Sequence, residues 1–176
     1  SKVFVVDYPV RNTQLCFERS RIGQVADGVE NAEIVPLSSG SAWTEVEIPG
    51  GSAMTSMEIA TVVHNADVLI AIPTAKHHGG AFVSFAMKGM MGLVKDRGYM
   101  HRHNLHQCVV DMCRVLKADL VITDARRTLV TRGPGGPGRV EHPNAILAGP
   151  NQTTVDAYTV TLAQWDNRTA TGRNVA

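Results

Sequence analysis

The stretch Val68-Leu-Ile-Ala-Ile72, which Pro73 ends, decides how the rest of the chain is interpreted. Five consecutive apolar residues with no polar alternation are typical of a strand that is buried on both faces of a sheet. The runs Val3-Phe-Val-Val6 and Leu120-Val-Ile122 have the same character. The sequence therefore predicts several buried strands that are distributed along the whole chain.

Segments with helical periodicity separate these strands. Met57, Ala60 and Val63 recur at helical spacing and predict a helix over 56–65. Asn104 and Gln107 resemble a capping box that opens a helix with one apolar face. Further helices are expected over 21–29 and after Thr153 or Thr154, and further strands over 32–37, 44–48 and 145–147. This alternation predicts an α/β fold, with a three-layer, mostly parallel sheet that has helices on both faces.

The composition is that of an ordinary globular protein. The 176 residues are 44% hydrophobic and 19% charged, which predicts a single α/β domain over residues 1–176. The chain starts directly on a strand and ends in a polar segment, so we expect a fragment excised from a longer protein. With a net charge of +1, the chain lacks the excess of positive charge that would indicate binding to nucleic acid or to an anionic membrane.

The cysteines and the N-terminus indicate the cellular compartment in which the protein is expected. Cys16, Cys108 and Cys113 form no CxxC pair and no complete iron–sulfur motif, and buried reduced thiols are the simpler interpretation. No signal peptide opens the chain, and its longest apolar stretch is too short to span a bilayer. We therefore expect a cytoplasmic location.

Polar residues follow three of the predicted strands. Asp7, the segment from Pro73 to His78, and Asp124 each come directly after a buried strand. Ligands bind beyond the carboxyl ends of the strands in open α/β sheets. We therefore expect Asp7, His78 and Asp124 to lie on one edge of a common sheet.

Histidines are concentrated in two short segments, Lys76-His-His78 and the run from His101 to His106. One hypothesis is a metal site, with zinc, iron or nickel held by His78 and by His101, His103 or His106. A metal-free site for an anion or for acid–base chemistry fits the same residues.

Lys88 stands among apolar residues in Phe82-Val-Ser-Phe-Ala-Met-Lys-Gly-Met-Met-Gly92. Desolvation lowers the pKa of a lysine and makes it a better nucleophile or base, whereas a snorkelling side chain keeps its ordinary pKa. We expect Lys88, His78 and Asp124 to be the catalytic residues of an enzyme at this site.

A glycine- and proline-rich segment, Arg132-Gly-Pro-Gly-Gly-Pro-Gly138, follows the Asp124 strand. It lacks the ending of a P-loop, and it is interpreted either as a phosphate-cradling lid or as a flexible turn. The lid interpretation makes Lys76, Gly133, Gly135 and Gly136 the candidates for binding a cofactor.

Several segments of the sequence together resemble a known family. The resemblance is carried by Pro73-Thr-Ala-Lys-His-His78, Ala86-Met-Lys-Gly-Met-Met-Gly-Leu-Val94, Asp96-Arg97, His101, Leu105-His-Gln107, Asp111, Ala118-Asp-Leu-Val-Ile-Thr-Asp124, Gly133-Pro134 and Asp156-Ala157. They are similar to the family catalogued as domain of unknown function three-six-two. Members are usually longer and some carry ferredoxin-like cysteine motifs, so the resemblance implies a domain fragment with an association to iron–sulfur proteins. A fainter similarity is to the N-terminal domain of nickel-pincer lactate racemases, in which a histidine, a lysine and a further histidine occur in the same order as His78, Lys88 and the later histidines.

Three functions remain open at this point. The first is an enzyme, or a redox-associated site, that binds a small anionic ligand or a metal. The second is a non-catalytic module that carries a metal or cofactor for a redox partner or for the missing domains of the parent protein. The third is a scaffold domain of a larger iron–sulfur protein.

Overall fold

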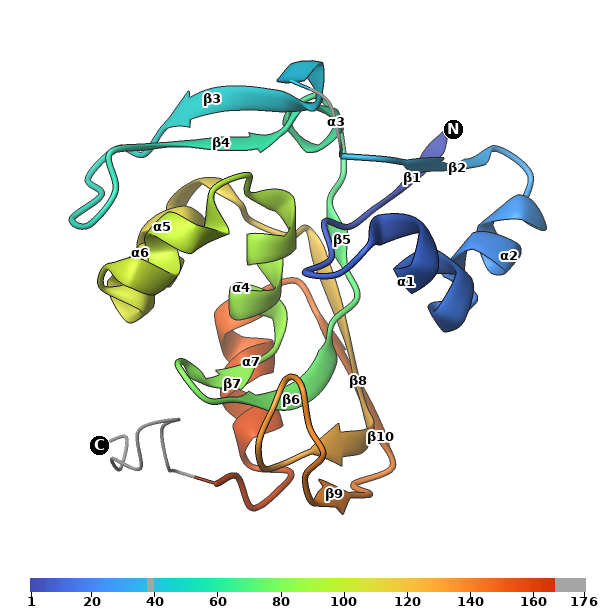
Figure 1. Cartoon of the computed structure of the whole chain (residues 1–176), viewed down its shortest axis with the longest axis vertical. Helices are drawn as coiled ribbons and strands as arrows, with labels where there is room; N and C mark the ends of the chain where they lie inside the picture. Colours follow the sequence, from blue (N-terminus) through green and yellow to red (C-terminus); the bar gives the residue numbers. More distant parts are fainter. Residues whose placement is uncertain (38–39, 167–176) are drawn as a thin grey trace. The chain divides into compact units, whose positions relative to one another are not determined.

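The computed structural model describes residues 1–37 and 40–166, and within them the strands form three separate sheets (Figure 1). The chain divides into two compact units that are interleaved in sequence. Unit 1 comprises Ser1–Glu47, Ser56–Ala66 and Gly92–Asp96, and unit 2 comprises Ile48–Thr55, Asp67–Met91 and Arg97–Ala176. The expectation of a single domain stays a prediction.

Among the residues that the structure describes, unit 1 holds two small sheets, three α-helices and the short helix η1. Its elements are β1 (Val3–Val6), α1 (Thr13–Ser20), α2 (Ile22–Asp27), β2 (Ala32–Val35), the short helix η1 (Gly40–Ala42), β3 (Trp43–Glu47), β4 (Ser56–Ala60) and α3 (Thr61–His64). Strand β1 runs parallel to β2, and β3 runs antiparallel to β4. The first strand therefore lies in a two-stranded sheet of its own, and the prediction that Asp7 shares a sheet edge with His78 and Asp124 is wrong.

The helices predicted for unit 1 are confirmed in part. Of the helix expected over 56–65, only α3 is helical. Residues 56–60 form strand β4, because Met57 and Ile59 both turn into the core at a spacing of two and the segment pairs with β3 along its whole length. The helix expected over 21–29 is α2, and the sequence did not predict α1, which precedes it and is separated from it by Arg21 at a φ of 61°. Asn12 caps α1 by accepting a hydrogen bond from the Leu15 amide.

Unit 2 is built around one long strand. Its elements are β5 (Ile70–Ala71), β6 (Thr74–His78), β7 (Phe82–Ser84), α4 (Ala86–Gly89), α5 (Arg97–Arg102), α6 (Leu105–Val115), β8 (Leu120–Leu129), β9 (Val140–Glu141), β10 (Ala145–Gly149) and α7 (Gln152–Val160); the short helix η2 (Met90–Leu93) starts in unit 2 and ends in unit 1. Strands β5 and β6 pair with β8 in parallel, and β10, β9 and β7 add antiparallel pairs around them. The predicted α/β class is confirmed.

The core of unit 2 lies between this sheet and its helices. Ala75 of β6, Ala125 of β8 and Phe85 are at most 1% exposed and pack together. Helix α7 packs on β8, β10 and α4. Helix α6 begins where predicted, with Asn104 accepting from the Gln107 amide, and it buries Cys108 and Met112 completely. Among the residues that the structure describes, no helix is long and apolar enough to cross a membrane.

Candidate functional site

The Lys76-His-His78 segment, which was expected to follow a buried strand, is itself the last part of strand β6. It pairs antiparallel with β7, which sets His77 opposite Val83 and His78 opposite Phe82. Side chains alternate along a strand, so Ala75 and His77 point into the core while Lys76 and His78 are only partly buried on the other face. The alternation separates the two adjacent histidines and leaves Lys76 and His78 for a site.

The ring of His78 is held in one tautomer. Its Nδ1 accepts hydrogen bonds from the backbone amides of Gly80 and Ala81, each at 3.0 Å. An acceptor nitrogen carries no proton, so the neutral ring has its proton on Nε2. Burial, and then the positive charges of Lys88 and neighbouring basic residues, lower the pKa of His78 to about 4. At neutral pH His78 is therefore an uncharged side chain that carries a donor N–H at Nε2.

Helix α4 positions Lys88 beside this histidine. The helix lies between buried Phe85 and buried Met90, and the lysine itself is partly buried. Burial, and then the charges of Lys76 and Arg97, lower the pKa of Lys88 to about 8. No acidic side chain within the described ranges pairs with the ammonium. The amine is consequently much easier to deprotonate than that of an ordinary lysine.

Asp156 fixes the first turn of α4. Its carboxylate, carried by α7, accepts from the Ala86 amide at 2.9 Å and from the Met87 amide at 2.8 Å. Burial raises the pKa of Asp156, and these two hydrogen bonds oppose that rise. Asp156 therefore caps a helix other than its own, and it thereby anchors the turn that carries Lys88.

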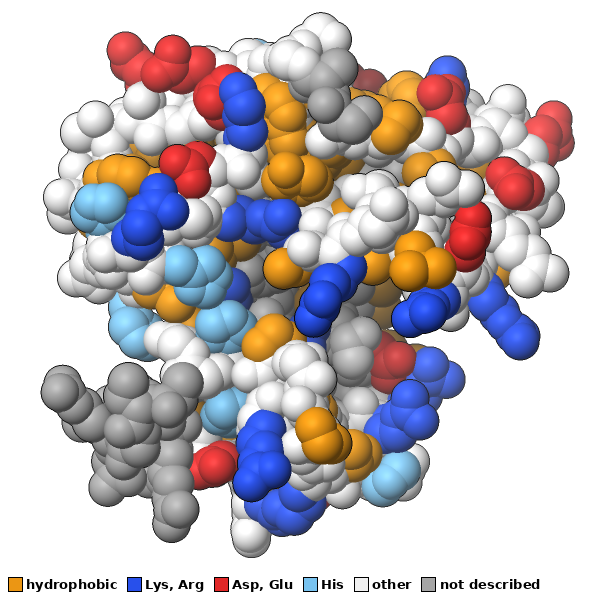
Figure 2. All heavy atoms as spheres, viewed as in Figure 1, with side chains coloured by type: hydrophobic (Ala, Val, Ile, Leu, Met, Phe, Trp, Pro, Cys, Tyr) orange, Lys and Arg blue, Asp and Glu red, His pale blue; other side chains and the backbone are white. Residues whose placement is uncertain are grey.

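Helix α5 completes the group. The ring of His101 stacks on that of His78 with their centroids 5.6 Å apart, and burial followed by the charges of Lys88 and Arg97 lowers its pKa. We call Lys76, His78, Lys88, Arg97 and His101 the cationic cluster. Every charged neighbour that shifts the pKa of His78, Lys88 or His101 is a basic residue. Figure 2 shows His, Lys and Arg side chains gathered on the face of unit 2 around these helices.

The other predicted metal ligands lie outside the cluster. His103 stacks on Tyr99 at 3.9 Å, and its Nδ1 lies 2.8 Å from the Tyr99 carbonyl oxygen, to which it donates. His106 is exposed on the first turn of α6. Within residues 1–37 and 40–166, no three His, Cys, Asp or Glu side chains are arranged to hold a metal ion.

The chemistry of His78 also disagrees with a metal site. A metal ion needs a lone pair, but Nδ1 already accepts two amide hydrogen bonds and Nε2 carries the proton. To bind a metal ion through Nδ1, the ring would have to lose both amide hydrogen bonds. To bind it through Nε2, the ring would have to move its proton away from that nitrogen. The residues of the cationic cluster therefore do not fit a zinc, iron or nickel centre built on His78.

Asp124 lies apart from His78. It sits inside β8 opposite Thr74, the first residue of β6, whereas His78 is the last residue of that strand. Four residues of extended chain span roughly 13 Å. The carboxylate pairs with Arg126 through two hydrogen bonds, of 3.1 and 2.9 Å, and these hold the pKa of Asp124 below its ordinary value. The predicted catalytic partnership with His78 finds no support in this placement.

The glycine-rich segment packs against the end of β6. The Gly133 amide donates to Nδ1 of His77 at 3.0 Å, and the Gly79 amide donates to the Gly133 carbonyl at 3.1 Å. A Cβ on Gly133 would lie 1.9 Å from the His77 carbonyl oxygen, so only glycine fits there. Gly135 has open space around it and Gly136 has a φ of +60°. Because the Gly133 amide is already used by His77, a cofactor-binding role for Gly133, Gly135 and Gly136 stays a prediction.

A second polar site of unit 2 surrounds Asp111, which is completely buried. One of its carboxylate oxygens accepts from the amides of residues 52, 53 and 54 at 2.6 to 3.1 Å, and the other accepts from the Gln107 side chain at 2.8 Å. Burial alone would raise the pKa of Asp111, but these hydrogen bonds outweigh it and lower the pKa. Asp111 therefore acts as an internal anion that holds a loop on α6.

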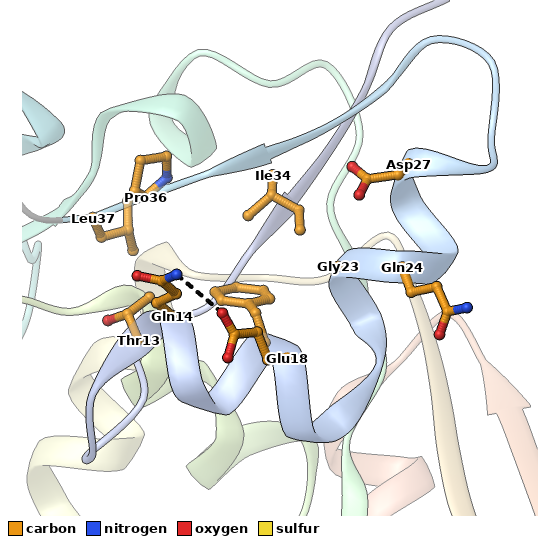
Figure 3. A pocket seen from close by; sticks show the side chains of 10 residues that line it. Thr13, Gln14, Glu18, Gly23, Gln24, Asp27, Ile34, Pro36 and Leu37 are labelled. Atoms are coloured by element: carbon orange, nitrogen blue, oxygen red, sulfur yellow. Dashed lines mark hydrogen bonds between the residues drawn. The ribbon is translucent and has the colours of Figure 1, made fainter.

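Unit 1 contains a hollow of about 800 Å³ that no pattern in the sequence indicated (Figure 3). Its walls come from α1, α2 and the end of β2, with Gln14 donating to Glu18 across one side. The lining residues are Thr13, Gln14, Phe17, Glu18, Gly23, Gln24, Asp27, Ile34, Pro36 and Leu37. Its charged residues are acidic and it contains no histidine or lysine, so its chemistry is the opposite of that in the cationic cluster.

Comparison with known families gives one match. The family model described as "Domain of unknown function (DUF362)" matches residues 1–161. No curated protein matches the chain. The similarity to nickel-pincer lactate racemases stays a prediction.

Proposed function

This chain belongs to the DUF362 family, and we propose that its cationic cluster binds a small anion that carries a carboxylate or phosphate group. The observation that carries the proposal is that basic side chains from β6, α4 and α5 gather around His78, whose ring stacks on that of His101 at 5.6 Å, and that burial and these basic neighbours lower the pKa values of His78, Lys88 and His101. Holding like charges together in a partly buried place costs free energy, and an anion bound among them offsets that cost.

The chemistry of the individual groups supports an anion rather than a metal. His78 offers an Nε2–H donor, Lys88 offers an ammonium with three donors, and Arg97 offers a planar guanidinium. Carboxylates and phosphates accept hydrogen bonds of this kind, and charge-assisted bonds are about twice as strong as neutral ones. The association with iron–sulfur proteins and with a redox partner stays a prediction that rests on the family.

Calorimetric titration of the chain with inorganic phosphate and with sulfate tests the proposal. We expect both anions to bind, and Lys88→Met to weaken binding by about tenfold or more, since a hydrogen bond to a charged group contributes about 1.5–3 kcal/mol. Lys117→Met is the matched control, because Lys117 is exposed and lies after α6. Binding should also weaken as salt is added. The proposal is wrong if the wild type binds neither anion, or if both variants lose affinity equally.

A further inference from the structure

The hollow of unit 1 has the size of a small-molecule site (Figure 3). Its volume of about 800 Å³ lies within the range of roughly 300–1,000 Å³ that is usual for ligand pockets. Phe17, Ile34 and Leu37 supply the main apolar part of its lining, and Leu37 is only 4% exposed. Every lining residue belongs to unit 1, so the hollow is a site separate from the cationic cluster.

The charged side chains that line the hollow are both acidic. Figure 3 shows Glu18 on α1 and Asp27 on α2 at its edge. Glu18 accepts a hydrogen bond from the neutral Gln14 amide at 3.0 Å, and within residues 1–37 and 40–166 neither carboxylate forms an ion pair. Each acid also lies in the last turn of its helix, where the terminal carbonyl groups favour a cation.

Exposed carboxylates are ordinary on a protein surface, and the aromatic and apolar lining beside them is what makes a site here. Phe17 is half-buried and directly precedes Glu18 on α1. The face of an aromatic ring attracts an ammonium group, and an apolar ligand body gains free energy by covering Ile34 and Leu37. An inorganic cation would leave the apolar lining in water, and a neutral apolar molecule would remove water from the carboxylates without pairing them.

We propose that the hollow binds small organic ammonium ions, in which a protonated amine is attached to an aromatic or aliphatic body. The ammonium group lies among Phe17, Glu18 and Asp27, and the body covers the apolar lining. This inference does not rest on the anion site, because the two sites share no residue and favour ligands of opposite charge.

Titration of the isotope-labelled chain with phenethylamine, followed by backbone amide NMR, tests the inference. We expect saturable shift changes in α1, α2 and β2. Phenethyl alcohol has the same body without the charge and should bind about tenfold more weakly, because exposed ion pairs and a cation–π contact each contribute only about threefold. Hydrocinnamate, an anion of similar size, and methylamine, which lacks the apolar body, should not saturate the site.

Isosteric variants of the two acids separate charge from shape. Glu18→Gln keeps an oxygen that accepts from Gln14, and Asp27→Asn keeps the size of its side chain. We expect each variant to weaken phenethylamine binding about threefold, and the double variant about tenfold, with no change for phenethyl alcohol. Glu30→Gln is the matched control, because Glu30 is an exposed acid of the same unit that does not line the hollow.

A third variant fills the hollow and leaves its charges in place. A Cβ on Gly23 would meet Ile34 Cδ1 at 3.7 Å, an ordinary contact, and both residues line the hollow. Gly23→Leu should therefore fit, and the chain should stay folded, because leucine favours a helix more than glycine does. We expect this variant to keep its thermal unfolding transition, to bind phosphate like the wild type, and to lose both phenethylamine and phenethyl alcohol.

Three results would overturn the inference. The first is the lack of a saturable shift change with phenethylamine in α1, α2 and β2. The second is equal affinity for phenethylamine and phenethyl alcohol, which would show that the carboxylates have no part in binding. The third is undiminished phenethylamine binding by folded Gly23→Leu, which would place the ligand elsewhere on the chain.

Discussion

Asp111 and the cationic cluster are two polar sites in unit 2 that satisfy charge in opposite ways. The buried carboxylate of Asp111 accepts three backbone amides and one side-chain amide, all from the chain itself. In the cationic cluster the charged neighbours of His78 and Lys88 are all basic. The hydrogen-bond donors around Asp111 come from the chain itself, whereas no acidic residue contributes to the pKa shifts of His78 and Lys88. We infer that the first arrangement is structural and that the surroundings of His78 and Lys88 suit an anionic ligand.

The largest effect that tests this contrast is expected at Asp111. Asp111→Ala leaves the amides of the loop over 52–54 without an acceptor, and we expect it to lower the free energy of unfolding by about 3 kcal/mol or more, because unpaired buried polar groups cost about 1–3 kcal/mol each. Urea denaturation measures the loss. Asp67→Ala, at an exposed position, should change stability by less than about 0.5 kcal/mol. Equal stabilities for the two variants would remove the distinction between the sites.

A smaller effect of opposite sign is expected at Lys88. Lys88→Met removes one of several positive charges that repel one another and keeps an apolar side chain of similar length. We therefore expect it to stabilise the free chain by about 0.5–1 kcal/mol, as is common where function costs stability. The same urea measurement checks it. Added sulfate should stabilise the wild type and leave Lys88→Met nearly unchanged, because only a ligand that binds the folded state shifts the equilibrium. A loss of stability in Lys88→Met would show that the lysine holds the fold together.

Only part of the fold and of the cationic cluster could be predicted from the sequence. The strand at 120–122 and the helix after Asn104 were predictable because their periodicity is local. The helix predicted over 56–65 is wrong for its first half, because Met57 fits both a helical and an alternating pattern and pairing with β3 decided for a strand; its second half forms α3. Lys76, His78, Lys88 and His101 were selected by residue type; in the structure His78 stacks on His101, and Lys88 and Lys76 help to lower the pKa of His78, while the functional role of these residues stays a prediction. The anchoring by Asp156 joins residues 69 and 70 positions apart, and no pattern in the sequence encodes such a contact.

The smallest and most specific effect is a proton that accompanies anion binding. The pKa of Lys88 is lowered from 10.5 to about 8 in the free chain, by burial and by Lys76 and Arg97. A bound anion favours the ammonium form and moves this pKa back toward 10.5. Between these two values the bound state holds more protons than the free state, so binding takes up protons and the affinity falls as the pH rises. Below pH 8 the lysine is protonated in both states and the uptake vanishes.

Calorimetry with sulfate, which does not titrate in this range, measures the uptake in buffers of different ionisation enthalpy. We expect a fraction of one proton between pH 8 and pH 10.5 in the wild type and none in Lys88→Arg, whose guanidinium stays charged. His78 and His101 do not account for such a signal, because burial and neighbouring basic residues lower the pKa values of both histidines from 6.5, well below this window. Equal uptake in the variant would assign the proton to another residue. It would also remove the evidence that the cationic cluster, unlike the site around Asp111, needs a ligand.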